Sequence, residues 1–156
     1  MNFLYNLFNL KSQLTPHEFI LKFIKDANNM HVQLEMYNAE KAVLQLESLK
    51  HVPIWFEWCC VGKNEFKDGF VIQYFVTKKE NKTNQIYNNS LNLKKDLELV
   101  VFYDKEYDVI NFVHFFNKDT TALELGKYIR VILDKIYNLS NEETQIGFKL
   151  SYIEHG

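Results

Sequence analysis

Two apolar runs joined by a polar turn constrain the fold of this chain more than any other feature. Residues 54–61 and 70–76 are apolar at almost every position and are rich in β-branched and aromatic side chains. The polar segment between them ends in Asp68-Gly69, so the pattern predicts a β-hairpin. Because both faces of each predicted strand are apolar, we expect protein or a partner to cover both sides of this hairpin. The hairpin should therefore lie at the centre of the fold.

Two capping patterns mark the starts of amphipathic helices. Thr15-Pro16-His17-Glu18 combines a capping threonine, a proline at the first helical position and a glutamate three residues after the cap. Thr121 and Glu124 form a second capping box, and apolar residues at helical spacing follow it as far as Ile136. The sequence therefore predicts one helix near the N-terminus and a longer one late in the chain.

Three further segments show strand patterns. Residues 97–103 and 109–116 flank a polar turn and predict a second hairpin, in which Tyr103 pairs with Val109. Residues 146–153 alternate between apolar and polar side chains, as a half-exposed edge strand does.

Residues 31–50 are ambiguous. Residues 31–37 alternate like a strand, whereas residues 38–50 are rich in good helix formers, so we favour a helix there. The alternative is a hairpin in which residues 42–48 pair with residues 31–37 over an Asn-Ala-Glu-Lys turn.

No repeat or linker divides the chain, so we expect one α+β domain over residues 1–156. Its largely antiparallel sheet should have about five strands, packed by the N-terminal helix and the long late helix. Residues 1–14 are expected to form an N-terminal extension, and residues 78–90 a mobile polar loop.

Composition and charge argue against several classes of protein. The net charge is −2, and Arg130 is the only arginine among 18 basic residues, which is unlike a nucleic-acid-binding surface. No apolar run reaches transmembrane length, and the N-terminus lacks the features of a signal peptide. Cys59 and Cys60 are adjacent and fit thiols in a reducing cytoplasm. We therefore expect a cytoplasmic protein with no nucleic-acid or membrane partner.

Candidate binding residues lie in the predicted hairpins. Glu57 and Gln73 are nearly the only polar residues of the central hairpin, where Glu57 follows Trp55 by two positions. If paired positions sum to 130, Glu57 faces Gln73, and a buried carboxylate with such a partner is a site candidate. A purely structural pair is the commoner arrangement.

The second hairpin offers a similar pair, because its predicted register places Glu98 opposite His114. A carboxylate beside a histidine can orient the ring for acid–base work or for metal binding. A cross-strand ion pair is again the commoner outcome. No established catalytic, phosphate-binding or metal-binding motif accompanies these residues, so we expect no cofactor and no metal.

A capped helix, antiparallel hairpins and a long late helix resemble, in their order along the chain, small secretion-chaperone-like domains. This resemblance implies binding of a client polypeptide. We therefore expect a non-catalytic cytoplasmic interaction protein, such as a client-binding chaperone, a toxin-neutralising partner or an adaptor. Its partner would be another polypeptide or a second copy in a homodimer. The alternative is a small-ligand-binding protein or small hydrolase with a pocket between sheet and helices.

Overall fold

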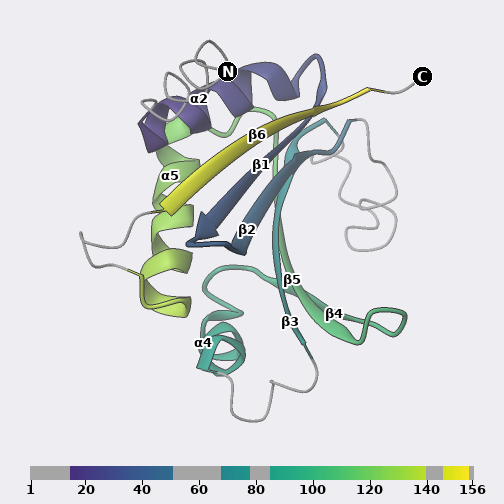
Figure 1. Ribbon diagram of the computed structural model, residues 1–156, viewed down its shortest axis with the longest axis vertical. Coiled ribbons are helices and arrows are strands. Elements are labelled where there is room, and N and C mark those ends of the chain that lie inside the picture. The colour runs from purple at the N-terminus through teal and green to yellow at the C-terminus, as the bar shows by residue number, and fades with distance from the viewer. Residues whose placement is uncertain (1–14, 51–67, 78–84, 140–145, 155–156) are drawn as a thin grey trace.

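The computed structural model describes residues 15–50, 68–77, 85–139 and 146–154, which form one antiparallel sheet of six strands with helices on one face (Figure 1). The strand order across the sheet is β4-β5-β3-β2-β1-β6. The elements in chain order are α2 (Pro16–Ala27), β1 (His31–Asn38), β2 (Lys41–Ser48), β3 (Phe70–Thr77), α4 (Gln85–Leu93), β4 (Val100–Asp104), β5 (Val109–Phe116), α5 (Ala122–Val131), the π-helix η3 (Ile132–Ile136) and β6 (Ile146–Ile153). The predicted α+β class is confirmed, with one strand more than expected.

Both predicted helix starts are confirmed. The Thr15 hydroxyl accepts a hydrogen bond from the main-chain N–H of Glu18 at 3.2 Å, and Thr121 does the same for Glu124 at 3.2 Å. Each capping residue has an extended backbone, and each glutamate side chain bonds back to the N–H of the capping residue. These reciprocal bonds satisfy N–H groups that have no partner inside the helix.

The favoured helix at residues 38–50 is wrong, and the alternative hairpin is present. β1 and β2 pair antiparallel, with Asn38 opposite Lys41 across a tight turn. Ala39 in this turn has a φ of 57°, the left-handed conformation that short hairpin turns require. Leu46 is fully buried, because strand pairing puts one face of this segment into the core. This burial outweighs the helix propensity of its residues.

The strand predicted at residues 70–76 is β3, but its partners differ from the prediction. At residues 70–73 β3 pairs with β2 on one edge and β5 on the other, so the predicted hairpin with residues 54–61 is wrong there. Residues 54–61 themselves, with Cys59 and Cys60, lie outside the described part of the chain.

Both faces of β3 are covered over part of its length. Ile72 belongs to the large core cluster beneath the helices, while Val71 belongs to a smaller buried cluster on the opposite face. Their exposed fractions are 1% and 0%. Phe75 departs from the prediction, because 61% of its surface is exposed. Both faces of β3 are therefore buried only near Phe70. Towards Thr77, Tyr74 and Val76 are buried on the helix-covered face, whereas Phe75 on the other face is exposed.

The second hairpin and the edge strand are confirmed with one shift in register. β4 and β5 pair antiparallel with Tyr103 opposite Ile110, one residue away from the predicted pairing with Val109. β6 lies at the edge of the sheet and pairs with β1. The polar loop predicted at residues 78–90 is wrong over its second half, where α4 forms. Residues 78–84 and 1–14 lie outside the described part.

Candidate functional site

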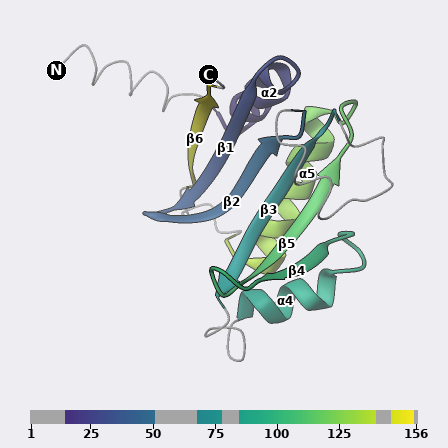
Figure 2. The same ribbon diagram turned by 90° about the vertical axis from the view of Figure 1, so that its right-hand side faces the viewer.

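A cleft opens in the sheet between β2 and β3. The described pairing of these strands runs from Ser48–Phe70 to Gln45–Gln73 and stops there. Figure 2 shows the two strands close together at one end and diverging towards the other. A cavity of about 430 Å³ lies at the diverging end, a size suited to a ligand or to several side chains of a partner.

A β-bulge in β2 gives a physical reason for this divergence. In the pairing with β1, Leu44 lies opposite Met36 and Ala42 lies opposite Tyr37, so Val43 is an extra residue in β2. A bulge bends its strand and increases its twist, and this one begins directly beyond the last pair with β3. It also turns Val43 and Leu44, which are neighbours in sequence, both into the core. The bulge therefore both opens the cleft and supplies part of its apolar wall.

The main-chain groups facing the cleft follow from the pairing that precedes it. Leu49 donates its N–H to the carbonyl of Gly69 at 2.9 Å, and the same register continues to Gln45–Gln73. In an antiparallel pair, every second residue directs its N–H and C=O to the same neighbour. Beyond Gln73, the residues of β3 that face β2 are therefore Phe75 and Thr77, for which no pairing with β2 is present among the described strands.

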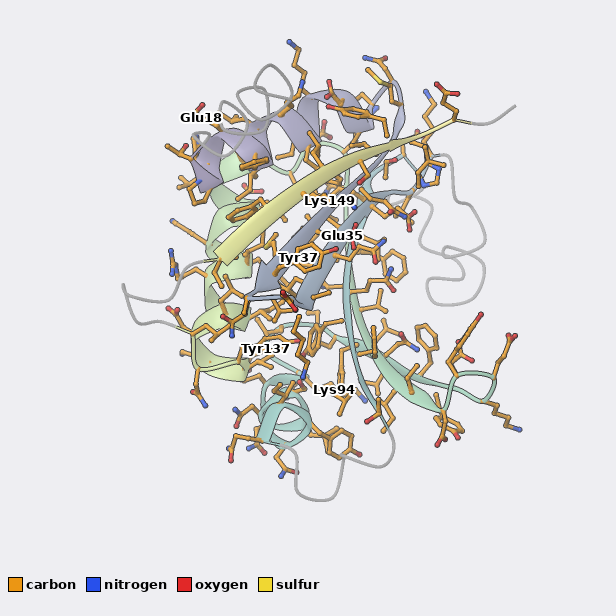
Figure 3. All side chains as sticks on the ribbon, in the orientation of Figure 1. Glu18, Glu35, Tyr37, Lys94, Tyr137 and Lys149 are labelled. Carbon is orange, nitrogen blue, oxygen red and sulfur yellow. The ribbon has the colours of Figure 1, made fainter. Side chains whose placement is uncertain are left out.

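Tyr137 closes one side of the cleft beneath β2. Its hydroxyl donates a hydrogen bond to the carbonyl of Val43 at 2.7 Å, and burial raises the pKa of Tyr137 far above its ordinary value. The π-helix brings the ring here, because a turn of this kind holds one more residue than an α-turn. The N–H of Tyr137 bonds the carbonyl of Ile132 at 3.1 Å. Figure 3 shows Tyr137 between the β1–β2 hairpin and α4.

Tyr74 forms a second aromatic wall. Its hydroxyl lies 2.7 Å from Oγ of Ser90, which in turn donates to the carbonyl of Ile86 at 2.6 Å. Because the single Ser90 hydrogen is used in that second bond, Tyr74 is the donor to Ser90. Burial raises the pKa of Tyr74 far above its ordinary value. The rings of Tyr74 and Tyr137 meet edge to face, with centroids 5.7 Å apart, so this wall is rigid and apolar.

The opposite side of the cleft is more polar. Gln45 lies beside Glu35 in the pairing with β1 and beside Gln73 in the pairing with β3. The Tyr37 hydroxyl donates to Glu35 at 2.7 Å, a bond that raises the pKa of Tyr37. The cleft thus has an apolar side towards the helices, whereas its side on the other face of the sheet combines amide and carboxylate groups with the exposed ring of Phe75.

Of the predicted site residues, Gln73 lies at the cleft. In β3 it sits between Gln45 and Val113, not opposite Glu57 as predicted. Trp55 and Glu57 lie outside the described part of the chain.

Glu98 and His114 do meet, though by a different contact from the one predicted. Nδ1 of His114 lies 3.1 Å from the main-chain oxygen of Glu98, which precedes β4 and has a φ of 50°. The imidazole stacks on Tyr128, with centroids 4.5 Å apart. His114 pairs with Ile72, so it occupies the helix-covered face and not the face of Gln73. The structure therefore places Gln73 and His114 on opposite faces of the sheet.

A buried polar cluster that the sequence prediction did not include lies on the other face of β1 and β2. Oε2 of Glu47 contacts Nε2 of His31 at 2.7 Å and accepts a hydrogen bond from Nε2 of Gln33 at 2.6 Å. His31 is 8% exposed and Glu47 is 5% exposed. The alternative hairpin at residues 31–50 joins these two segments, but its turn over residues 38–41 would have paired Gln33 with Leu46. The extra residue Val43 shifts the register by one and brings Gln33 opposite Glu47.

The cleft residues missed from the sequence are Val43, Phe75 and Tyr137. One local signal was present, since the apolar run Ala42-Val43-Leu44 interrupts the alternation of apolar and polar residues in β2.

Within the described ranges, no group of three or more His, Cys, Asp or Glu side chains could hold a metal ion. In the same ranges, every helix is too short or too polar to span a bilayer. No known protein family, curated protein or solved structure matches this chain.

Proposed function

We propose that this protein is a non-catalytic cytoplasmic interaction module that binds another polypeptide in the cleft between β2 and β3. One observation carries the proposal: Phe75 is 61% exposed although it belongs to a central strand of the sheet. A large aromatic side chain beside an apolar cavity is the kind of surface that protein partners use as an anchor. A client-binding chaperone, a toxin-neutralising partner and an adaptor would all use such a surface.

The chemistry of the cleft supports binding over catalysis. The hydroxyls of Tyr74 and Tyr137 are engaged with Ser90 and with the carbonyl of Val43. Burial raises the pKa of both phenols above a value at which they are already neutral near pH 7, so neither can act as a phenolate base. Groups held in this way position the walls of a site and are poorly suited to accepting a proton from a substrate.

Binding of a small apolar ligand is the second candidate function. The volume of about 430 Å³ falls in the range of small-molecule sites. The apolar lining with a few amides is also typical of them. This candidate differs from the first in one measurable respect, which is the mass of the bound species.

Site-specific photo-cross-linking in cells tests the proposal. A photoreactive phenylalanine analogue replaces Phe75 in one variant and Leu123 in a matched control, since Leu123 is equally exposed (63%) but lies on α5. We expect discrete polypeptide adducts from position 75 and none of the same mass from position 123. Adducts of small mass alone would favour the second candidate. Equal polypeptide labelling from both positions, or no labelling from position 75, would reject the cleft as the binding surface.

A further inference from the structure

We infer that the partner enters the cleft as an extended segment and adds to the edge of β3 as a strand, through the main-chain groups of Phe75 and Thr77. This inference rests on the proposed function and names the form in which the partner binds. It depends on three features of the described residues: the unpaired edge of β3, the occupied edge of β2, and the different chemistry of the two sides of the cleft.

The edge of β3 offers the hydrogen-bonding pattern of a strand. Main-chain groups of successive residues in a strand point to opposite neighbours. The Leu49–Gly69 bond sets this alternation in β3, so the N–H and C=O groups of Phe75 and Thr77 point into the cleft. Tyr74 and Val76 direct theirs to β5, where they pair with Phe112 and Ile110. Main-chain groups at the edge of a strand are a template for another strand, which satisfies them in register.

The edge of β2 is already occupied at the corresponding point. The carbonyl of Val43 accepts a hydrogen bond from the hydroxyl of Tyr137. This side chain therefore replaces the main-chain hydrogen bond that β3 would donate to Val43 if β2 had no bulge. An incoming strand therefore has its main-chain partner on β3, and Tyr137 forms part of the wall that it meets on the other side.

The two sides of the cleft define the side chains of the incoming segment. Successive side chains of a strand point to opposite faces. Those directed towards the helices meet Tyr74, Val76 and Tyr137, which favour large apolar groups. Those directed to the other face meet the amides of Gln45 and Gln73 and the exposed ring of Phe75, so this face accepts both polar and aromatic groups. The expected occupant is therefore an extended segment with a large apolar residue at every second position.

Substitutions at Thr77 test strand addition without disturbing the existing sheet. Thr77→Pro removes an N–H that faces the cleft. Proline is tolerated at the end of a strand where the missing N–H does not pair with a neighbouring strand. Thr77→Val keeps the N–H and the shape of the side chain, so it is the matched control. Circular dichroism and thermal unfolding of each full-length variant establish that the fold is retained.

The probe is a phage-displayed library of short random peptides, selected on the full-length wild-type protein. We expect enriched peptides with a large apolar residue at every second position. Their affinity should be unchanged for Thr77→Val and at least about tenfold weaker for Thr77→Pro, the factor that corresponds to one lost hydrogen bond. On the wild-type protein, N-methylation of every second amide of a selected peptide should abolish binding, whereas methylation of the intervening amides should not. This second arm needs no variant, so it decides the matter if Thr77→Pro fails to fold.

Strand addition is overturned if selected peptides bind Thr77→Pro as tightly as wild type, if methylation shows no alternation, or if no peptide is enriched. The cross-linking experiment at position 75 separates this failure from that of the proposed function. If polypeptide adducts persist in the Thr77→Pro background, the cleft is still the binding surface, and only the claim that the partner binds as an added strand is rejected.

Discussion

Replacing Tyr137 by phenylalanine tests the contact that holds the bulged part of β2 at the edge of the cleft. The change removes one hydroxyl and leaves the ring, so packing against Tyr74 is retained. The lost bond is the one to the carbonyl of Val43 at 2.7 Å, and that carbonyl is left without a partner in a buried residue. We expect the free energy of unfolding to fall by about 1–2 kcal/mol at pH 7. The melting temperature should fall by roughly 3–6 °C for a chain of this size.

The same substitution should have a pH dependence of known sign. Burial raises the pKa of Tyr137 in the folded protein, so above about pH 10 the unfolded chain releases a proton that the folded protein retains. The stabilisation is therefore complete below that pH and is lost as pH rises, at up to about 1.4 kcal/mol per pH unit. Phenylalanine does not ionise, so the penalty of Tyr137→Phe should shrink above pH 10 and vanish near about pH 11.

Urea unfolding followed by circular dichroism at several pH values between 7 and 11 measures both effects. Tyr107→Phe is the control, because Tyr107 is 71% exposed in the turn between β4 and β5, and its change should stay within about 0.5 kcal/mol. The reasoning would be refuted if Tyr137→Phe matched this control at pH 7, or if its penalty were constant up to pH 11.

Three further changes test other parts of the structure by the same unfolding measurement. Gly69→Ala should cost about 1–3 kcal/mol, because an added Cβ would lie 1.8 Å from the main-chain oxygen of Phe116; a stability equal to wild type would contradict this close approach. Glu47→Ala should cost about 2–4 kcal/mol by removing the buried acceptor shared by His31 and Gln33, and a loss below about 0.5 kcal/mol would show that the cluster is not coupled to folding. Thr121→Ala should cost about 1 kcal/mol through the lost helix cap, whereas Thr121→Ser should restore most of it; equal losses would argue against capping.

The parts of the fold that were predicted correctly depend on local chemistry. The caps at Thr15 and Thr121 are complete within four residues of sequence, so one sequence suffices to place them. The hairpin β4–β5 also joins neighbouring segments. The predicted register of this hairpin is wrong by one residue, because hydrogen bonds within the turn decide which residues pair. Two of these bonds run from the main-chain N–H groups of Glu106 and Tyr107 to the Asp104 carboxylate.

The parts that were missed depend on contacts between distant segments. Residues 38–50 have the composition of a helix, and only pairing with β1 and β3 and burial of Val43, Leu44 and Leu46 in the core make a strand the better solution. The partners of β3 are β2 and β5, and the second of these is about forty residues away in sequence, so a rule that pairs adjacent runs chooses wrongly. The cleft depends on a single extra residue, Val43, which is defined only relative to the pairing of β1. Gln73 was nonetheless identified, because a polar residue in an apolar strand is visible in the sequence alone.

Residue-resolved amide hydrogen exchange of the isolated protein tests most directly whether β3 presents an unpaired edge in the cleft. Protection should alternate beyond Gln73, with slow exchange at Tyr74 and Val76, which face β5, and fast exchange at Phe75 and Thr77, which face the cleft. Equal protection at all four amides would contradict the account, because it would mean that the edge is already paired and cannot receive a strand.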